Sequence, residues 1–236
     1  MPAVNRHFIA FLAAAAVFIS AMLIADTTGW IPQLLIGATT AAFLWLLMRR
    51  SPVDSRQVLC AILVATTGEI VLSLGWGLYT YQHALIPLYV PFGHGLFYAL
   101  AAETAEQPWL RRHSSSITPA VLVIGTIIAV VSLIGFRDQW GMLWWIGAGL
   151  LILRSRNQLM LSACFIYTMP LEWMGTAIGN WRWAAEVPLV GLHSANPPAG
   201  VGILYILLDL ITMAICARLF QPQTHPTLEM QRVAEV

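Results

Sequence analysis

The chain has 236 residues, of which 58% are hydrophobic and only 10% are charged. A soluble domain carries about 25% charged residues, so this composition excludes an ordinary water-exposed surface and favours a protein that faces lipid. The formal net charge of +1 provides no strongly basic surface, which argues against a nucleic-acid partner.

Apolar runs long enough to cross a bilayer recur along the whole chain. A membrane-spanning helix needs about 20 mostly apolar residues. Eight segments approach or reach this length, so we predict an all-α fold: a polytopic membrane helix bundle with about eight transmembrane helices. The segments cover residues 8–25, 31–48, 57–78, 91–107, 117–135, 139–153, 158–178 and 199–219.

The arginines give these segments a direction. Ten of the twelve fall at one set of predicted helix ends, and only Arg137 and Arg182 fall at the other. The positive-inside rule makes the arginine-rich side cytoplasmic. We therefore expect a multi-pass protein of the cell (inner) membrane with both termini in the cytoplasm.

One sequence pattern occurs twice, in the third and seventh predicted helices and the segments that follow them. An acid is followed by a glycine, two aromatic residues in alternation and a Pro-Leu pair: Glu69, Gly77, Tyr79, Tyr81 and Pro87 in the first copy, and Glu172, Gly179, Trp181, Trp183 and Pro188 in the second. We predict two parallel four-helix repeats, residues 1–113 and 114–222, followed by a cytoplasmic tail, residues 223–236. Chance similarity between apolar segments is the alternative interpretation.

Three carboxylates lie deep inside predicted helices: Glu69, Glu172 and Asp209. An ionisable group at this depth costs about 2.5–3.5 kcal/mol, which makes it a functional candidate. Residues three or four positions apart share a helix face, so we expect nearby hydroxyls to hydrogen-bond the two glutamates: Thr66, Ser73, Thr168 and Thr176. At least one of the three acids is then expected to be protonated near neutral pH and to act as a catalytic acid. A structural carboxyl satisfied by a neighbouring helix is the alternative.

A second group of residues is predicted to bind the substrate. Aromatic side chains at the predicted non-cytoplasmic end would line a mouth above the buried acids, although an interfacial aromatic belt explains them equally well. The predicted binding residues are Tyr79, Tyr81, His94, Trp181, Trp183, Asn196 and Tyr205. No histidine pair has the short spacing of a preformed metal site, so we expect no metal or cofactor, with ligation across helices left open.

Two of these strings resemble segments of known membrane enzymes. The string Glu69, Gly75-Trp76-Gly77-Leu78-Tyr79-Thr80-Tyr81 and Pro87-Leu88, with its later counterpart Trp181-Arg182-Trp183, Pro188-Leu189 and Asn196-Pro197, resembles membrane carotenoid hydratases. The duplicated units are similar to membrane lycopene cyclases, although Pro170-Leu171-Glu172 lacks the second acid of their motif. Integral-membrane terpene cyclases use one early and one late acid, and Glu69 and Asp209 occupy those places. The resemblance implies protonation or hydration of an isoprenoid alkene.

The expected function is that of an integral membrane enzyme acting on an apolar, lipid-like isoprenoid. Its chemistry would be of the cyclase, hydratase or isomerase type, performed by intramembrane carboxylic acids without a cofactor. The first alternative is a proton-coupled transporter that uses the same acids as a relay. The second is a non-catalytic membrane subunit that binds a pigment or a quinone.

Overall fold

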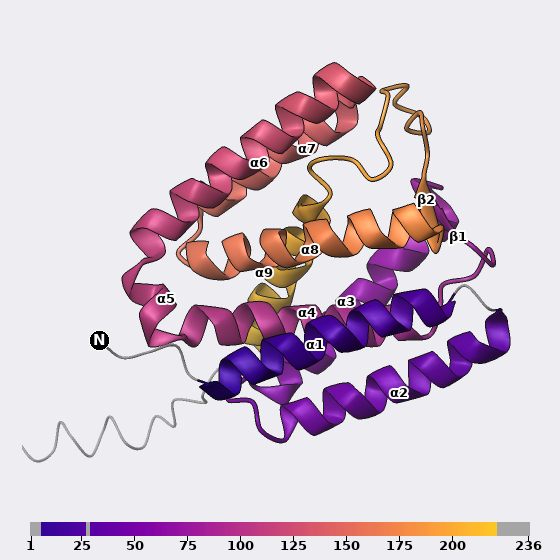
Figure 1. Cartoon of the computed structure of the whole chain (residues 1–236). Helices are drawn as coiled ribbons and strands as arrows, with labels where there is room; N and C mark the ends of the chain where they lie inside the picture. Colours follow the sequence, from indigo (N-terminus) through magenta and orange to yellow (C-terminus); the bar gives the residue numbers. More distant parts are fainter. Residues whose placement is uncertain (1–5, 27–28, 221–236) are drawn as a thin grey trace, which may run out of the picture.

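The computed structural model describes residues 6–26 and 29–220, so the predicted tail at 223–236 lies outside the described residues. The described chain is mostly helical (Figure 1). Its long helices are α1 (Arg6–Ala25), α2 (Trp30–Met48), α3 (Ser55–Glu69), α4 (Tyr89–Glu106), α6 (Ser114–Phe136), α7 (Gln139–Arg154), α8 (Gln158–Ile178) and α9 (Gly202–Leu219). The π-helix η2 (Ile70–Gly75) continues α3, and the short α5 (Pro108–Arg112) joins α4 to α6.

Each of the eight predicted segments overlaps one of these long helices. Among the described residues, five helices are long and apolar enough to cross a bilayer, with mean hydropathies from 1.7 to 2.6: α1, α2, α3 together with η2, α6 and α9. The helices α4, α7 and α8 are outside this group. Many residues of α4 and α8 are buried inside the bundle, so their side chains face protein rather than lipid and can be more polar. A total of eight crossings stays a prediction.

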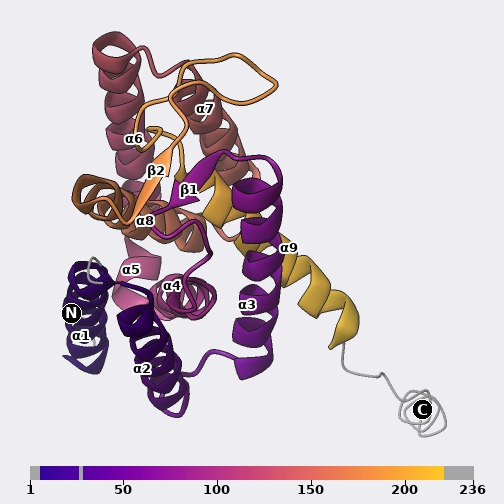
Figure 2. The same cartoon turned by 90° about the vertical axis from the view of Figure 1, so that its right-hand side faces the viewer.

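The helices α3, α4, α8 and α9 form the centre of the bundle. The helix α4 packs against α2, α3 and α8, and α9 packs against α3, α7 and α8. Figure 2 views α4 nearly end-on, with α3, α8 and the two strands around it. The pair α6 and α7 covers one side of this centre, and α1 and α2 cover the other (Figure 1).

A small sheet, which the all-α prediction did not include, accompanies the helices. The strands β1 (Tyr79–Tyr81) and β2 (Trp181–Trp183) pair antiparallel, with Tyr79 opposite Trp183 and Tyr81 opposite Trp181. The outer residues of each strand are buried and the middle residue is exposed. This alternation is the period of a half-buried strand. The sequence shows the same alternation, with an aromatic residue on each side of a polar one, in Tyr79-Thr80-Tyr81 and Trp181-Arg182-Trp183.

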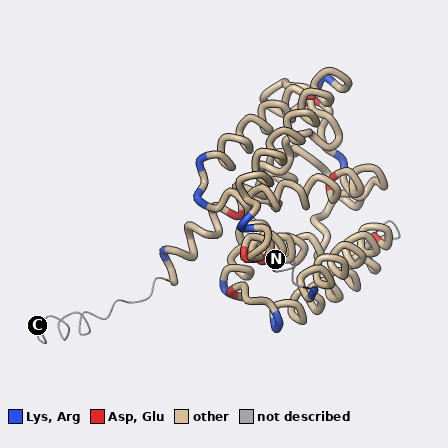
Figure 3. Tube along the Cα trace, turned by 60° about the vertical axis from the view of Figure 1, so that its left-hand side comes forward, with Lys and Arg blue, Asp and Glu red and all other residues tan. Residues whose placement is uncertain are grey.

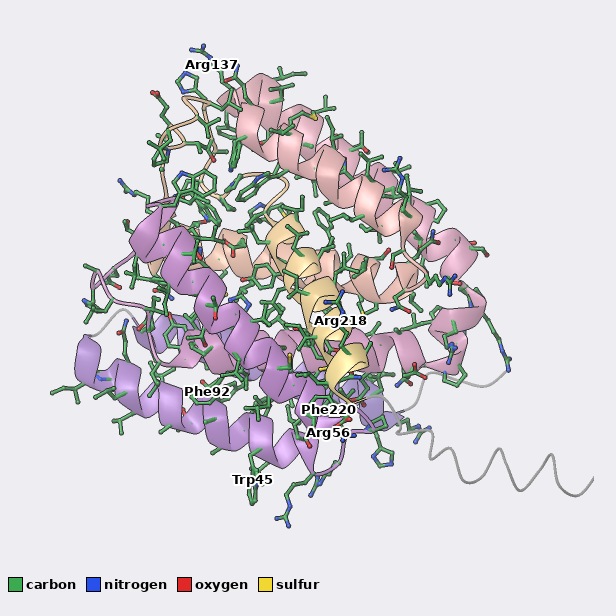
Figure 4. The ribbon with its side chains drawn as sticks, turned by 180° about the vertical axis from the view of Figure 1, so that it is seen from behind. Trp45, Arg56, Phe92, Arg137, Arg218 and Phe220 are labelled. Carbon is green, nitrogen blue, oxygen red and sulfur yellow. The ribbon has the colours of Figure 1, made fainter. Side chains whose placement is uncertain are left out.

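Charged residues gather near the helix ends and leave most of the trace uncharged (Figure 3). Arg56, Arg218 and Phe220 lie close together at one end, whereas Arg137 lies at the opposite end (Figure 4). The Arg56 guanidinium sits 4.8 Å from the centre of the Phe220 ring. We call the end with Arg56, Arg218 and Phe220 the arginine-rich end, and the opposite end, with Arg137, the strand end. Which of them faces the cytoplasm stays a prediction.

Two buried acids occupy corresponding junctions in the predicted repeats. Asp26 follows α1 and accepts a hydrogen bond of 2.5 Å from the Tyr89 hydroxyl at the start of α4. Asp138 follows α6 and accepts one of 2.7 Å from the backbone N–H of Ala199, shortly before α9. Each acid therefore ties a helix junction to the start of a central helix. The repeat itself stays a prediction.

Candidate functional site

Glu69 is the last residue of α3, and its carboxyl group is surrounded by three side chains. The Tyr79 and Tyr81 hydroxyls donate hydrogen bonds of 2.9 and 2.8 Å to Oε2. The Nε2 atom of His94, on α4, lies 3.1 Å from Oε1. Only 6% of Glu69 is exposed, so these groups replace water as its hydrogen-bonding partners.

Glu172, on α8, is held by a corresponding set. The indole N–H groups of Trp181 and Trp183 donate to Oε2 at 2.9 and 3.1 Å. The Tyr205 hydroxyl, on α9, donates to Oε1 at 3.1 Å. Each glutamate therefore accepts two bonds from the strand that follows it and makes a third contact with a side chain of a central helix.

The strand pairing brings the two carboxyl clusters together. The rings of Tyr79 and Trp183 lie 4.5 Å apart across the sheet, and those of Tyr81 and Trp181 lie 6.2 Å apart. On the helices, the rings of His94 and Tyr205 are 4.8 Å apart. The two acids thus share one continuous aromatic wall.

The π-helix η2 compensates for a difference in chain length. Ten positions separate Glu69 from Tyr79, but only nine separate Glu172 from Trp181. Directly after Glu69 the helix widens into η2, and the Trp76 N–H bonds the Val71 carbonyl. A π turn takes up extra chain within a helix, so both strands reach their acids despite the different spacing.

Several contacts fix the second strand. The Asn196 Oδ1 atom accepts a hydrogen bond of 2.9 Å from the backbone N–H of Trp183. The Asp138 carboxylate accepts bonds from the Ala195 and Ala199 N–H groups and so anchors the loop that contains Asn196. A Cβ atom at Gly175 would lie 2.0 Å from the Trp181 ring, so glycine is required for this ring to pack on α8.

Both carboxyl clusters line one central cavity of about 600 Å³. Apart from the clusters, its walls are mainly apolar side chains of α1, α3, α4, η2, α8 and α9. Some wall residues on η2 and α9 have large exposed fractions: 55% for Val71, 38% for Leu207 and 47% for Ile211. The cavity therefore reaches the apolar surface between α3 and α9, where a membrane protein meets lipid.

Of the residues predicted from the sequence, the structure brings together both glutamates with Tyr79, Tyr81, His94, Trp181, Trp183 and Tyr205. Asn196 supports β2 and does not line the cavity. Asp209 is buried, but it too is outside the cavity wall; the Cys164 thiol is its neighbour. Tyr205 bonds Glu172 rather than Asp209.

The predicted hydroxyl partners of the glutamates are wrong. Thr66, Thr168 and Thr176 donate instead to helix carbonyl groups, and Ser73 donates to the carbonyl of Tyr79. Threonine and serine in a helix readily bond the preceding turn, so these groups were already satisfied. The true donors lie nine or more positions further along the chain and come close only because the chain folds back after each helix.

The tyrosines of β1 keep their hydroxyl protons. Burial raises the pKa of the Tyr79 and Tyr81 hydroxyls, and the adjacent Glu69 carboxylate raises it further. Both phenols therefore stay protonated at neutral pH. Among the described residues, no three His, Cys, Asp or Glu side chains are placed to hold a metal ion.

Comparison with protein-family models, curated protein sequences and solved structures finds no match to this chain.

Proposed function

We propose that this protein is an integral membrane enzyme that protonates an apolar isoprenoid and resolves the resulting cation by cyclisation, isomerisation or hydration. The observation that carries the proposal is the pair of buried glutamates facing one apolar cavity that is open toward lipid. A hydrocarbon substrate would be taken up directly from the bilayer, and the cavity volume suits a lipid-sized molecule.

The hydrogen-bonding partners of the two glutamates suit them to different chemical roles. An indole N–H can only donate, so the Oε2 atom of Glu172 must accept from both Trp181 and Trp183. Glu172 is therefore suited to remain a carboxylate. The partners of Glu69 are hydroxyls and an imidazole, which can both donate and accept. We assign the transferable proton to the pair formed by Glu69 and His94.

In this mechanism, a proton leaves the Glu69–His94 pair and forms a C–H bond with one carbon of a substrate double bond. The π electrons of that bond are consumed, and the other carbon becomes cationic. The Glu172 carboxylate and the faces of the surrounding aromatic rings stabilise this charge. In cyclisation or isomerisation Glu172 then accepts a proton from the cation, whereas in hydration water adds and Glu172 accepts the proton that the water loses.

The test is expression in a bacterial host that makes isoprenoid lipids, followed by mass spectrometry of the lipid extract. The wild type should convert a host or supplied isoprenoid into an isomer or a hydrate. Glu69→Gln and Glu172→Gln should each reduce product at least about 100-fold, the scale of a general acid–base contribution. The control is Glu103→Gln, which changes an acid on α4 that is outside the cavity wall.

Normal product formation in both glutamine variants would overturn the assignment. Proton-driven uptake by proteoliposomes without any change in the lipids would favour the transporter. A visible chromophore that copurifies unchanged would favour a pigment-binding subunit.

A further inference from the structure

One face of α9 carries a line of polar groups that leads away from the glutamates. Tyr205, Asp209 and Thr212 are spaced by four and three positions, so they lie on the same side of the helix. At 1.5 Å per residue, the line covers about 10 Å along the helix axis. Tyr205 bonds Glu172, and Asp209 and Thr212 follow along the helix toward the arginine-rich end.

Two groups on this line are buried without a protein partner. Asp209 is 3% exposed and Thr212 is fully buried. Within residues 6–26 and 29–220, neither the Oδ2 atom of Asp209 nor the Oγ1 atom of Thr212 has a hydrogen bond. An unsatisfied buried polar group costs about 1–3 kcal/mol. Such groups are commonly satisfied by internal water, which needs two or more polar partners of this kind.

The far end of the line approaches a second pocket, which we call the arginine-end pocket. It has a volume of about 580 Å³, and Gln57, Tyr98 and Met213 are among the residues that line it. Its wall also contains exposed charged side chains, among them Arg111 and Arg156, so it is open to water. The Tyr98 hydroxyl donates to Gln57 at 2.9 Å and interacts electrostatically with Asp209.

We infer that Asp209 and Thr212 hold internal water and form a path for protons between the arginine-end pocket and the glutamates. The path runs from Gln57 and Tyr98 past Asp209 to Tyr205, which bonds Glu172. The use of the path rests on the proposed function. In cyclisation or isomerisation, the proton accepted by Glu172 leaves along it while a solvent proton recharges the Glu69–His94 pair. In hydration, the same path delivers the water that is consumed, and the proton that Glu172 accepts leaves along it while a solvent proton recharges the Glu69–His94 pair. Asp209 is then a relay residue and does not touch the substrate.

Cys164 provides a direct test that needs no substrate, because its thiol lies beside Asp209 although only 3% of the residue is exposed. Hydroxyl radicals made from water by a short X-ray pulse oxidise side chains next to that water. In wild-type protein in lipid nanodiscs, Cys164 should be oxidised while its neighbour Phe165 stays unmodified.

Replacing the polar groups should dry the path. We expect Thr212→Val, and more strongly Asp209→Leu combined with Thr212→Val, to lower Cys164 oxidation at least about fivefold, since apolar cavities stay dry. The control is Thr118→Val, a buried threonine on α6 whose hydroxyl accepts a hydrogen bond from Ser162 and is not part of the line. Circular dichroism identifies the variants that fold. Unchanged Cys164 oxidation in a folded Thr212→Val protein overturns the inference.

Turnover provides the second measurement. Asp209→Asn should lower kcat about tenfold or more and leave KM nearly unchanged, because the relay acts on protons and not on substrate binding. Formate should restore part of the rate by carrying protons in place of the carboxyl, and absence of this rescue overturns the relay. Wild-type labelling of Cys164 without any turnover overturns only the proposed enzyme, whereas turnover without labelling overturns only the water path.

Discussion

At the scale of single residues, the two acids differ in what surrounds them. The Oε2 atom of Glu172 accepts from two indoles, while the corresponding atom of Glu69 accepts from two phenols. Phenols can reverse their hydrogen bonds and indoles cannot. The same backbone arrangement therefore supports a glutamate that is suited to supply a proton and a glutamate that is suited to remain a carboxylate between turnovers.

Removing the indole donors should weaken the fold in a cooperative way. Trp183→Phe keeps a ring but loses one hydrogen bond to the carboxylate, and we expect a loss of about 1.5 kcal/mol in the free energy of unfolding. Combining it with Trp181→Phe should cost more than the sum of the single changes, because Oε2 is then left without a donor. Denaturant unfolding in detergent micelles measures this, with the exposed Trp109→Phe as control. Strictly additive losses would contradict it.

The sequence was sufficient to locate the acids but not their partners. Glu69 and Glu172 were predicted from their depth in apolar segments, and both are buried. A helical wheel then suggests neighbours three or four positions away, whereas Tyr79 and Trp181 come from beyond a turn. Only the paired aromatic strings contained that signal, and an aromatic belt at the membrane surface would explain them as well.

At the scale of elements, the π-helix η2 compensates for the longer chain between acid and strand in the first copy. It adds one residue to the path from Glu69 to Tyr79. The corresponding part of α8 is an ordinary helix that ends at Gly179 in the left-handed conformation, with φ of 87°. The two segments should therefore respond differently to a change in length.

Deleting Leu74 from η2 should convert it to an ordinary helical turn and give the first copy the nine-position spacing of the second. We expect the variant to remain folded, with a change in unfolding free energy of about 1 kcal/mol, since Leu74 is 55% exposed and the π turn is relieved. Deleting Ile178 from α8 should instead rotate both tryptophans away from Glu172 and prevent folding. The yield of monodisperse protein and its Tm compare the two. Equal damage from both deletions would show that η2 has no such role.

Hydropathy predicted where the helices lie because lipid-facing segments must be apolar over their whole length. It did not predict β1 and β2, since three residues are too short for a strand signal to stand out against adjacent apolar helices. The π-helix was also missed. The sequence shows it only as a difference of one residue in the spacing from glutamate to strand between the two copies. That difference can be interpreted only once the structure shows that both strands reach corresponding acids.

At the scale of the whole molecule, the arrangement of charges predicts an orientation. Arg56 and Arg218 lie at the arginine-rich end, and Arg137 lies at the strand end (Figure 4). Under the positive-inside rule, the arginine-end pocket opens to the cytoplasm and the small sheet faces the other side. Protons for the site would then come from the cytoplasm.

Cysteine labelling of intact cells tests this orientation. Leu189→Cys, at a position 99% exposed near the strand end, should react with a membrane-impermeant maleimide. Arg50→Cys, in the connection between α2 and α3, should react only after the membrane is permeabilised. Wild-type protein measures the background from the three native cysteines. The reverse pattern would invert the predicted topology.

The indole bonds to Glu172 also have an optical consequence. Excitation of an indole moves electron density away from the nitrogen edge of the ring, the edge that Trp181 and Trp183 present to the carboxylate. A negative charge there stabilises the excited state and shifts emission to longer wavelength, and neutralising the charge reverses the shift. The emission of these two tryptophans therefore depends on the charge on Glu172, and we expect a molecule that enters the cavity to change it.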